Sequence, residues 1–434
     1  MLLPQLTPQL NSAKLTNQVN YYMEPISAKD REVLRELARR KVELSHCKRN
    51  EEILKMWDNQ AKGIKGTPTV RLLFSNFTKE VIDSRMRCEG KDAQKLERRL
   101  LESMVGRELF DDDTPVSDTL DIPIFEGASP FGASPQLTHA KNSMGFHIEP
   151  ITDDIESDID LFRGGKFYVD TELTKEYCAW SDDAIGDILP SKIVQESIKG
   201  AITNPLVTLI NMETYYMSMY DCPDSLHEIM EMATKVYEDY YDYLEANNCL
   251  LPTNGYSPIA QESFAFTDEL PCEGPITSTK QIWGFLESQE TTAISPAMFG
   301  EFAFPYLDRL ARRYGLLSYG CCERVDNLWE DYISKWDNLR KLSVSPFNNE
   351  ELVGEYLRGT RVVYYSKPRA EYVTNVGPLD DEAVRNCFRS IAKAASGCLF
   401  EVAQREVGTI FGDFERGRRY VQLAKETINE YWQP

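Results

Sequence analysis

Two adjacent thiols and a carboxylate, Cys321, Cys322 and Glu323, directly follow the apolar run 315–320. The run has strand character, so these side chains are expected at the C-terminal end of a buried strand. In α/β barrels, that end of the strands carries the chemistry. Side chains alternate along a strand, so Cys322 faces away from Cys321 unless the chain turns there. A turn is plausible because the strand ends at this point. Cys321 is a candidate nucleophile, although free cysteines are often buried as small hydrophobic residues.

Polar side chains also follow two other predicted strands. Glu287 and Glu290 come after the apolar segment 282–286. They are candidates to position or protonate a substrate, or they face the N-terminus of the next helix, where carboxylates are favourable. Lys367 and Arg369 follow the segment 361–365. They either bind an anionic group or pair with surface acids.

A helix with a clear start signal precedes the thiols. Ser295 is a candidate N-cap and Pro296 occupies the first helical position, where its missing N–H costs nothing. An apolar stripe at helical spacing follows: Phe299, Phe302, Tyr306 and Leu310.

Strands and helices alternate along most of the chain. Residues 1–66 predict amphipathic helices, an N-terminal extension of a main body at 67–434. Strands are predicted at 69–74, 120–125, 201–210, 248–251, 282–286, 315–320, 339–344, 361–365 and 398–403. This pattern indicates βαβ units and a parallel sheet, and the number of units favours a closed (β/α)8 barrel. The cluster Asp111–Asp113 is interpreted as a solvated turn and 127–145 as a long irregular loop. His147 follows this loop, and it either reaches the barrel mouth or is structural.

The composition limits the partners. The 434 residues are 42% hydrophobic and carry a formal net charge of -21. This charge argues against nucleic acid or an anionic membrane as partner. No apolar run approaches the roughly 20 residues needed to span a bilayer, and the first 20 residues lack the layout of a signal peptide. Ten scattered cysteines fit reduced thiols in a cytoplasmic protein. No nucleotide-binding glycine motif follows a strand.

Two segments resemble the uroporphyrinogen decarboxylase superfamily. The first is Trp283–Tyr306, with Glu-Ser-Gln-Glu-Thr leading into Ser-Pro-x-Met-Phe-x-Glu-Phe-x-x-Pro-Tyr. The second is Thr203-Asn204-Pro205, followed by Pro223-Asp224-x-x-His227. The resemblance covers about residues 110–430. It implies a TIM barrel, and either tetrapyrrole decarboxylation or zinc-dependent methyl transfer between corrinoid proteins and thiols.

The residues favour the methyltransferase branch of this superfamily. The arginine-rich N-terminal motif that holds the carboxylates of uroporphyrinogen is not found. The methyltransferases use His-x-Cys at a strand end, plus a later Cys, as zinc ligands. Here the place reads Tyr319-Gly320-Cys321, so the cysteine matches and the histidine does not. The resemblance therefore implies a zinc site at Cys321 that Cys322, Glu323, Glu401 or Glu406 would complete.

The sequence thus predicts methyl transfer between a corrinoid protein and a thiol or other small acceptor. Zinc would lower the pKa of a bound thiol and deliver a thiolate to the methyl group. The predicted catalytic residues are Cys321, Glu323, Glu287 and Glu290; the cofactor-binding residues are Tyr319, Lys367 and His147; the metal ligands are Cys321, Cys322 and Glu406. Two alternatives stay open: a decarboxylase of a small or tetrapyrrole substrate, and a non-catalytic barrel that binds a corrinoid or tetrapyrrole.

Overall fold

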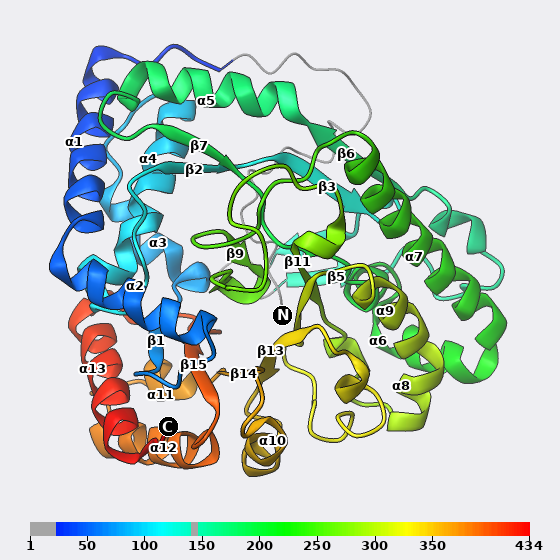
Figure 1. Cartoon of the computed structure of the whole chain (residues 1–434). Helices are drawn as coiled ribbons and strands as arrows, with labels where there is room; N and C mark the ends of the chain where they lie inside the picture. The colour runs from blue at the N-terminus through cyan, green and yellow to red at the C-terminus, as the bar shows by residue number, and fades with distance from the viewer. Residues whose placement is uncertain (1–22, 140–145) are drawn as a thin grey trace.

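A parallel seven-stranded sheet forms the centre of the molecule (Figure 1), in the order β1-β15-β14-β13-β12-β11-β8. The structure is a computed structural model and describes residues 23–139 and 146–434. The sheet strands are β1 (Thr69–Leu72), β8 (Ile198–Lys199), β11 (Trp283–Leu286), β12 (Leu316–Tyr319), β13 (Leu339–Val344), β14 (Val363–Ser366) and β15 (Leu399–Gln404). Six of the nine predicted strands are confirmed here or nearly so, and β2 (Leu120–Pro123) confirms a seventh.

Two predicted strands are wrong. Residues 201–210 belong largely to the helix α6 (Thr203–Asp221), in which Leu206, Leu209 and Ile210 are buried at helical spacing. Residues 248–251 form no strand. Both are short apolar runs, for which periodicity alone does not distinguish a buried helix from a strand. The predicted loop 127–145 is also wrong in part, because it contains strand segments: β3 (Phe125–Ser129) pairs with β6 (Lys166–Asp170), and β4 (Gln136–His139) pairs with β5 (Phe146–Glu149).

The sheet is not continued by hydrogen bonding from β1 to β2. Within the described residues, β2 pairs instead with β7 (Ser191–Val194), and β7 leads directly into β8 at the other edge of the sheet. This arrangement is compatible with a barrel-like α/β fold, in which no hydrogen bonds join β1 to β2 within the described residues.

The free edge of β1 is covered by the acidic cluster. Asp113 Oδ2 accepts a hydrogen bond from Val70 N at 2.9 Å, and Asp112 Oδ2 accepts one from Leu72 N at 3.2 Å. Asp112 and Asp113 are buried, so the prediction of a solvated turn is wrong for them. Buried backbone N–H groups need partners, and these carboxylates supply them in place of a neighbouring strand.

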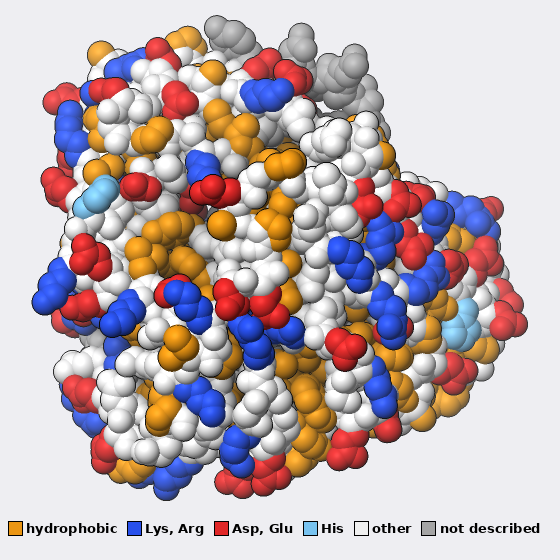
Figure 2. All heavy atoms as spheres, in the orientation of Figure 1, with side chains coloured by type: hydrophobic (Ala, Val, Ile, Leu, Met, Phe, Trp, Pro, Cys, Tyr) orange, Lys and Arg blue, Asp and Glu red, His pale blue; other side chains and the backbone are white. Residues whose placement is uncertain are grey.

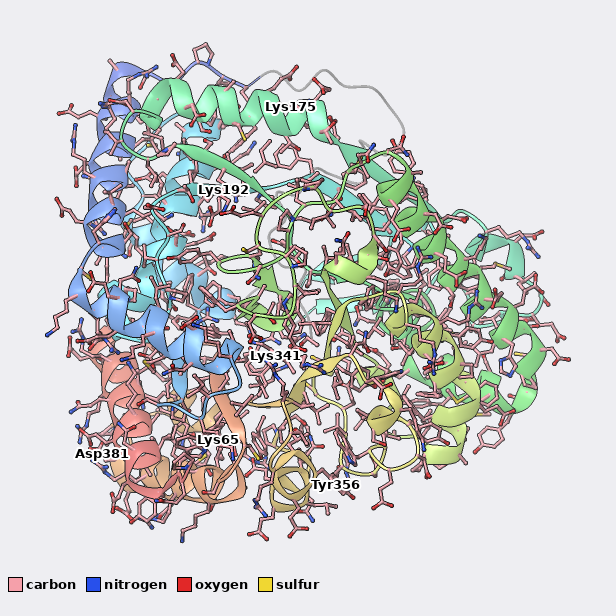
Figure 3. The ribbon with its side chains drawn as sticks, in the orientation of Figure 1. Lys65, Lys175, Lys192, Lys341, Tyr356 and Asp381 are labelled. Carbon is pink, nitrogen blue, oxygen red and sulfur yellow. The ribbon has the colours of Figure 1, made fainter. Side chains whose placement is uncertain are left out.

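The predicted N-terminal helices are present from residue 28 onwards, and residues 1–22 lie outside the described chain. Ser27 caps α1 (Ala28–Ser45), which packs against α4 (Lys91–Val105) and α5 (Thr171–Ile185). α2 (Lys48–Ala61) places Trp57 against the Lys341 ammonium, 5.2 Å from the ring centroid. Lys341 lies near the centre of the molecule (Figure 3).

A segment between two short strands, β9 (Pro258–Ile259) and β10 (Ser263–Phe264), fills the inside of the curved sheet. Ser263 Oγ donates to Glu401 Oε1 at 2.8 Å, and Lys341 Nζ donates to Glu401 Oε2 at 2.8 Å. All three side chains are buried. Glu401 therefore belongs to the interior of the sheet.

The remaining helices cover the outside. Ser295 caps α8 as predicted, with Oγ accepting from Met298 N at 3.2 Å, but the predicted helix is divided in two at Ala303. These helices are α7 (Pro223–Ala246), α8 (Pro296–Phe302), α9 (Phe304–Ala311), α10 (Glu350–Leu357), α12 (Asp381–Ala394) and α13 (Phe414–Tyr431), with short helices α3 (Thr78–Val81) and α11 (Glu371–Thr374). None of the described helices is long and apolar enough to cross a membrane. Acidic and basic side chains are interspersed on the face in Figure 2.

Candidate active site

Side chains that follow four of the five consecutive strands β11 to β15 meet at the carboxyl edge of the sheet. Glu287 follows β11, the two thiols follow β12, Lys367 follows β14, and Arg405 follows β15. Parallel strands end at the same edge, so these residues are brought together although up to 118 positions separate them in the sequence.

The chain turns at Gly320, which has φ +99°, and this turn brings the two thiols together. The Sγ atoms of Cys321 and Cys322 are 3.6 Å apart. Two hydroxyl groups hold the turn: Ser343 Oγ donates to the Cys321 carbonyl at 2.7 Å, and Ser345 Oγ donates to the Cys322 carbonyl at 3.0 Å. The thiols therefore have a fixed relative position.

The two thiols have opposite electrostatic character. The hydrogen bond between them and burial raise the pKa of Cys321, so its sulfur keeps the proton. The same hydrogen bond, with help from the positive charge of Lys367, lowers the pKa of Cys322 to about 7 against the effect of burial. Cys322 is only partly buried, whereas Cys321 is 1% exposed. Cys322 is therefore the thiol of the pair that loses its proton more readily, and it is the more exposed of the two.

Lys367 is a buried cation beside the thiols. Its Nζ donates to Gln261 Oε1 at 2.9 Å and lies 5.1 Å from the centroid of the Tyr365 ring. Burial lowers the pKa of Lys367, and the neighbouring Cys321 opposes this effect. In the described chain no carboxylate forms an ion pair with Lys367, so its charge acts on the sulfur atoms. Lys367 does not pair with a surface acid in the described chain, and its predicted role in binding a cofactor stays a prediction.

Glu287 lies on the other side of Cys321. Burial raises the pKa of Glu287 well above its ordinary value, and its neighbours Cys321, Glu290 and Glu323 add to this effect. Its Oε2 atom is buried and has no hydrogen-bond partner in the described residues. Glu287 is therefore a protonated carboxyl group that can donate a proton.

Three of the predicted residues hold the site together. Glu323 accepts from Ser288 N at 2.9 Å and from Cys321 N at 2.6 Å, which joins the loops after β11 and β12. Glu290 accepts from Thr203 Oγ1 at 2.7 Å and from Asn204 Nδ2 at 2.8 Å at the start of α6. The third is Tyr319, which is buried and whose hydroxyl group lies 2.8 Å from Ser288 Oγ. These contacts give all three a positioning role.

The described residues do not supply a zinc site. Across residues 23–139 and 146–434, no three His, Cys, Asp or Glu side chains converge so as to hold a metal ion. Glu406, a predicted ligand, lies 3.4 Å from Asn76 Nδ2 and 3.9 Å from Arg405. Both carboxylate oxygens of Glu323 accept backbone N–H groups, and Glu401 is bound to Lys341 inside the sheet. The donor set therefore does not fit zinc, which needs at least three protein ligands.

Two histidines named from the sequence lie away from the thiols, and one arginine that was not named lies near them. His147 lies in β5, where its backbone pairs with Thr138 of β4. The side chain of His147 lies outside the described residues. His227 Nδ1 lies 2.8 Å from the Tyr306 hydroxyl group, a structural contact. Arg405 was missed: it is 7% exposed, its Nε atom has no partner in the described chain, and Cys321 and Glu262 are electrostatic neighbours. Its position directly after the predicted strand 398–403 is the signal that indicates it.

Comparison with solved structures shows what the chain is similar to. A methyltransferase from Methanosarcina mazei superposes with a TM-score of 0.50 over 86% of this chain and 98% of that chain, at 12% sequence identity. This chain shares that protein's fold. No protein family profile and no curated protein sequence matches the chain. The superfamily resemblance of the sequence therefore stays a prediction, and the likeness in structure supports the expected α/β fold.

Proposed function

We propose that this chain is a methyltransferase that moves a methyl group to a small thiol. The observation that carries this proposal is the Cys321–Cys322 pair beside the buried Lys367 cation. The pair presents a thiolate at near-neutral pH at the carboxyl edge of the sheet. The Methanosarcina mazei methyltransferase of the same fold supports the reaction class. A protein-bound corrinoid is the proposed methyl donor, in agreement with the superfamily resemblance.

The proposed chemistry is a direct displacement at carbon. The Cys322 thiolate accepts the proton of the acceptor thiol, and the positive charge of Lys367 stabilises the new acceptor thiolate. The acceptor sulfur then attacks the methyl carbon. A sulfur–carbon bond forms, and the electron pair of the broken bond stays with the donor. A corrinoid donor that keeps this electron pair needs no proton, so the proton held by Cys322 passes to solvent, and the Glu287 carboxyl group positions the acceptor by a hydrogen bond. No step requires zinc.

Two matched cysteine variants test this proposal. The substrates are methylcobalamin and 2-mercaptoethanol, and the readout is the loss of the methyl–cobalt absorption band. Removing a positioned general base lowers rates by roughly 100-fold or more, so Cys322→Ser should be slower by this factor. Cys387→Ser, which changes a cysteine of α12 outside the site, should retain the wild-type rate. Equal rates for Cys322→Ser and the wild-type protein would contradict the proposal.

We also infer that the curved sheet belongs to the barrels of the uroporphyrinogen decarboxylase superfamily. The support is the sequence resemblance and the seven parallel strands of one sheet. In addition, β2 pairs with β7, the segment that directly precedes the edge strand β8 in the sequence. The interruption between β1 and β2 is then a local feature of this chain.

A further inference from the structure

A cavity of about 280 Å³ opens at the interruption between β1 and β2. Its walls come from β1, from α4 with the π-helical turn Gly106–Phe110 that follows it, from the loop before β2, and from the segment around β9 and β10. π-helical turns are rare and are frequently found at functional sites. The proposed methyl-transfer site uses no residue that lines this cavity.

Three cations face this cavity without a carboxylate partner. Lys41 Nζ donates to Ser117 Oγ at 3.0 Å, Arg99 NH1 donates to the Asp121 carbonyl at 3.1 Å, and Arg71 Nε donates to Thr114 Oγ1 at 3.1 Å. Within the described part of the chain, none of the three forms an ion pair. Lys41 also donates to the Thr119 carbonyl and Arg71 to the Glu262 carbonyl. Ammonium has three donors and guanidinium five, so Lys41 retains one free N–H group and the two arginines retain several. This wall of the cavity is therefore suited to an anion.

Two of the lining carboxylates are already bound within the protein. Asp112 accepts from Leu72 N and Thr114 N, and Asp121 accepts from the hydroxyl groups of Ser117 and Thr119. Asp112 therefore holds the edge of β1, and Asp121 acts on only one of the three cations, Lys41, whose pKa it raises against the effect of burial.

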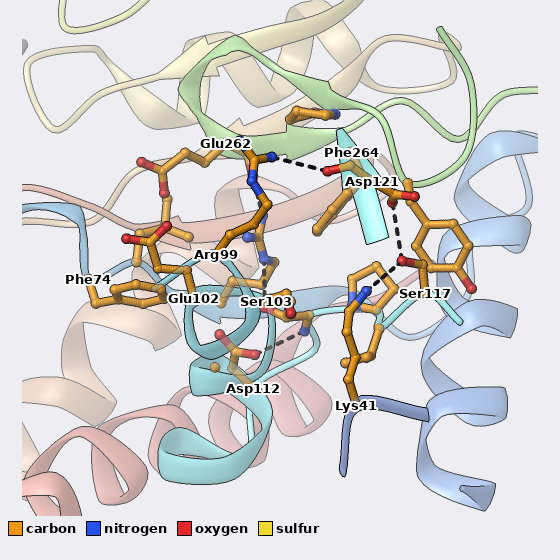
Figure 4. Close-up of a pocket in the computed structure, with 18 of the residues that line it drawn as sticks. Lys41, Phe74, Arg99, Glu102, Ser103, Asp112, Ser117, Asp121, Glu262 and Phe264 are labelled. Atoms are coloured by element: carbon orange, nitrogen blue, oxygen red, sulfur yellow. Dashed lines mark hydrogen bonds between the residues drawn. The ribbon is translucent and has the colours of Figure 1, made fainter. Parts of the chain in front are cut away.

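Two further carboxylates lie together at one side of the cavity. Figure 4 shows Glu102 and Glu262 beside Phe74, with Lys41, Ser117 and Asp121 at the other side and Arg99 between. Burial raises the pKa of Glu102, and repulsion from Glu262 contributes to the rise. The nearest cation to Glu102 is Arg98, at 4.0 Å. A bound cation at this side would relieve the repulsion.

The cavity thus has a cationic wall, a pair of carboxylates and apolar lining between them from Leu72, Leu73, Val116, Phe74 and Phe264. We propose that it binds a small zwitterion of the α-amino-acid class. The α-carboxylate contacts Arg99 and Arg71, and the α-ammonium group, on the same carbon, contacts Glu102 and Glu262. The side chain of the ligand lies against the apolar residues. This site is separate from the thiol pair and does not depend on the proposed methyl transfer.

The test uses the whole chain and thermal unfolding with each standard L-amino acid as probe. At least one is expected to raise the Tm. That amino acid is then compared by calorimetry with its analogues that lack the α-ammonium or the α-carboxylate group. Each lost charge contact should weaken binding by about tenfold. The absence of any Tm shift, or equal binding of the carboxylate-only analogue, would overturn the proposal.

Three variants separate the two ends of the ligand. Arg99→Met should weaken the binding of both the amino acid and its carboxylate-only analogue by about tenfold. Glu102→Gln should weaken the amino acid but leave the carboxylate-only analogue unchanged. Ser103→Leu fills the cavity without removing a charge and should abolish binding of both. Lys91→Met, which removes an exposed cation from the same helix, is the control. Equal affinity of all these variants and the wild-type protein would contradict the assignment.

Discussion

At the residue scale, the two thiols after β12 differ because one donates a hydrogen bond to the other. Cys321 is buried and its pKa is raised, so it keeps its proton. Cys322 is more exposed, and the positive charge of Lys367 helps to lower its pKa. A nucleophilic or basic thiolate requires this kind of environment, and a buried structural cysteine lacks it. The sequence indicated Cys321 by its place at the end of a strand and by its alignment with a zinc ligand. The proposed mechanism instead gives the chemistry to its neighbour.

The first prediction concerns the alkylation of Cys322. Thiolates react with iodoacetamide and thiols do not, so the labelling rate of Cys322 should rise with pH around a midpoint of about 7. Lys367→Met removes the neighbouring positive charge and should move this midpoint upward. Lys335→Met, an exposed lysine, serves as control and should leave it unchanged. Peptide mass spectrometry after timed labelling gives the rates. A midpoint that stays the same in Lys367→Met would show that the cation does not act on the thiol.

The second prediction contrasts two buried carboxyl groups. The pKa of Glu287 is raised in the folded protein. At a pH above the ordinary pKa of a glutamate, the folded protein therefore retains a proton that the unfolded chain has lost. The folded state binds more protons in this range, and the free energy of unfolding falls as pH rises, by up to about 1.4 kcal/mol per pH unit. Glu287→Gln removes this loss and should be more stable than wild type at pH 7 in urea unfolding.

Glu323→Gln is the matched comparison. The Glu323 carboxylate accepts hydrogen bonds from two backbone N–H groups. The amide of the variant would turn its NH2 group toward one of these donors. We expect a loss of about 1–3 kcal/mol. The same stability change in both variants would contradict the different roles given to the two residues.

At the scale of the elements, the alternation of strands and helices was predictable because parallel strands read as short apolar runs. β1, β2 and β11 to β15 follow the predicted segments closely, and so does the Ser295 cap. The start of α6 was misread because its buried face lies within a continuous apolar run. The role of Asp112 and Asp113 was not predictable, since it depends on which strand edge remains unpaired in the fold. Arg405 and Lys367 meet the thiols only once the sheet has brought their strands together.

The third prediction concerns Gly106, at the start of the π-helical turn. A Cβ atom there would lie 2.6 Å from Asp112 Oδ1 and 2.8 Å from Thr114 Oγ1. Asp112 has little freedom to move because it holds the edge of β1. Gly106→Ala should therefore destabilise the protein by about 1–3 kcal/mol. Gly66→Ala is the control, because its nearest neighbour is the flexible amide end of Asn59. Denaturant unfolding of both variants measures the difference, and an unchanged midpoint for Gly106→Ala would contradict the close packing.

At the scale of the whole molecule, a buried ion pair joins distant parts of the chain. Lys341 on β13 donates to Glu401 on β15 and to Ser263 on β10. Trp57 of α2 packs against the Lys341 ammonium group. Burial lowers the pKa of Lys341, and Glu401 opposes this effect. The sequence could not indicate the pair, because 60 positions separate the two residues and only the folded sheet brings β13 and β15 close together.

The fourth prediction follows from this pair. Lys341→Met leaves the Glu401 carboxylate buried without its cation, so the free energy of unfolding should fall by about 3–5 kcal/mol. Lys341→Met combined with Glu401→Leu removes both charges and should recover most of the loss. Urea unfolding of the single and double variants tests this. A double variant less stable than Lys341→Met alone would contradict the electrostatic explanation.

Formation of the methylated thiol tests the central claim most directly. Methylcobalamin carrying a deuterated methyl group is incubated with 2-mercaptoethanol and the protein, and the labelled thioether is detected by mass spectrometry. The account predicts labelled product with the wild-type chain and with Cys387→Ser, and a rate near that of the protein-free reaction with Cys322→Ser. Product formation by Cys322→Ser at the wild-type rate, or none above the protein-free rate by the wild-type chain, would contradict it.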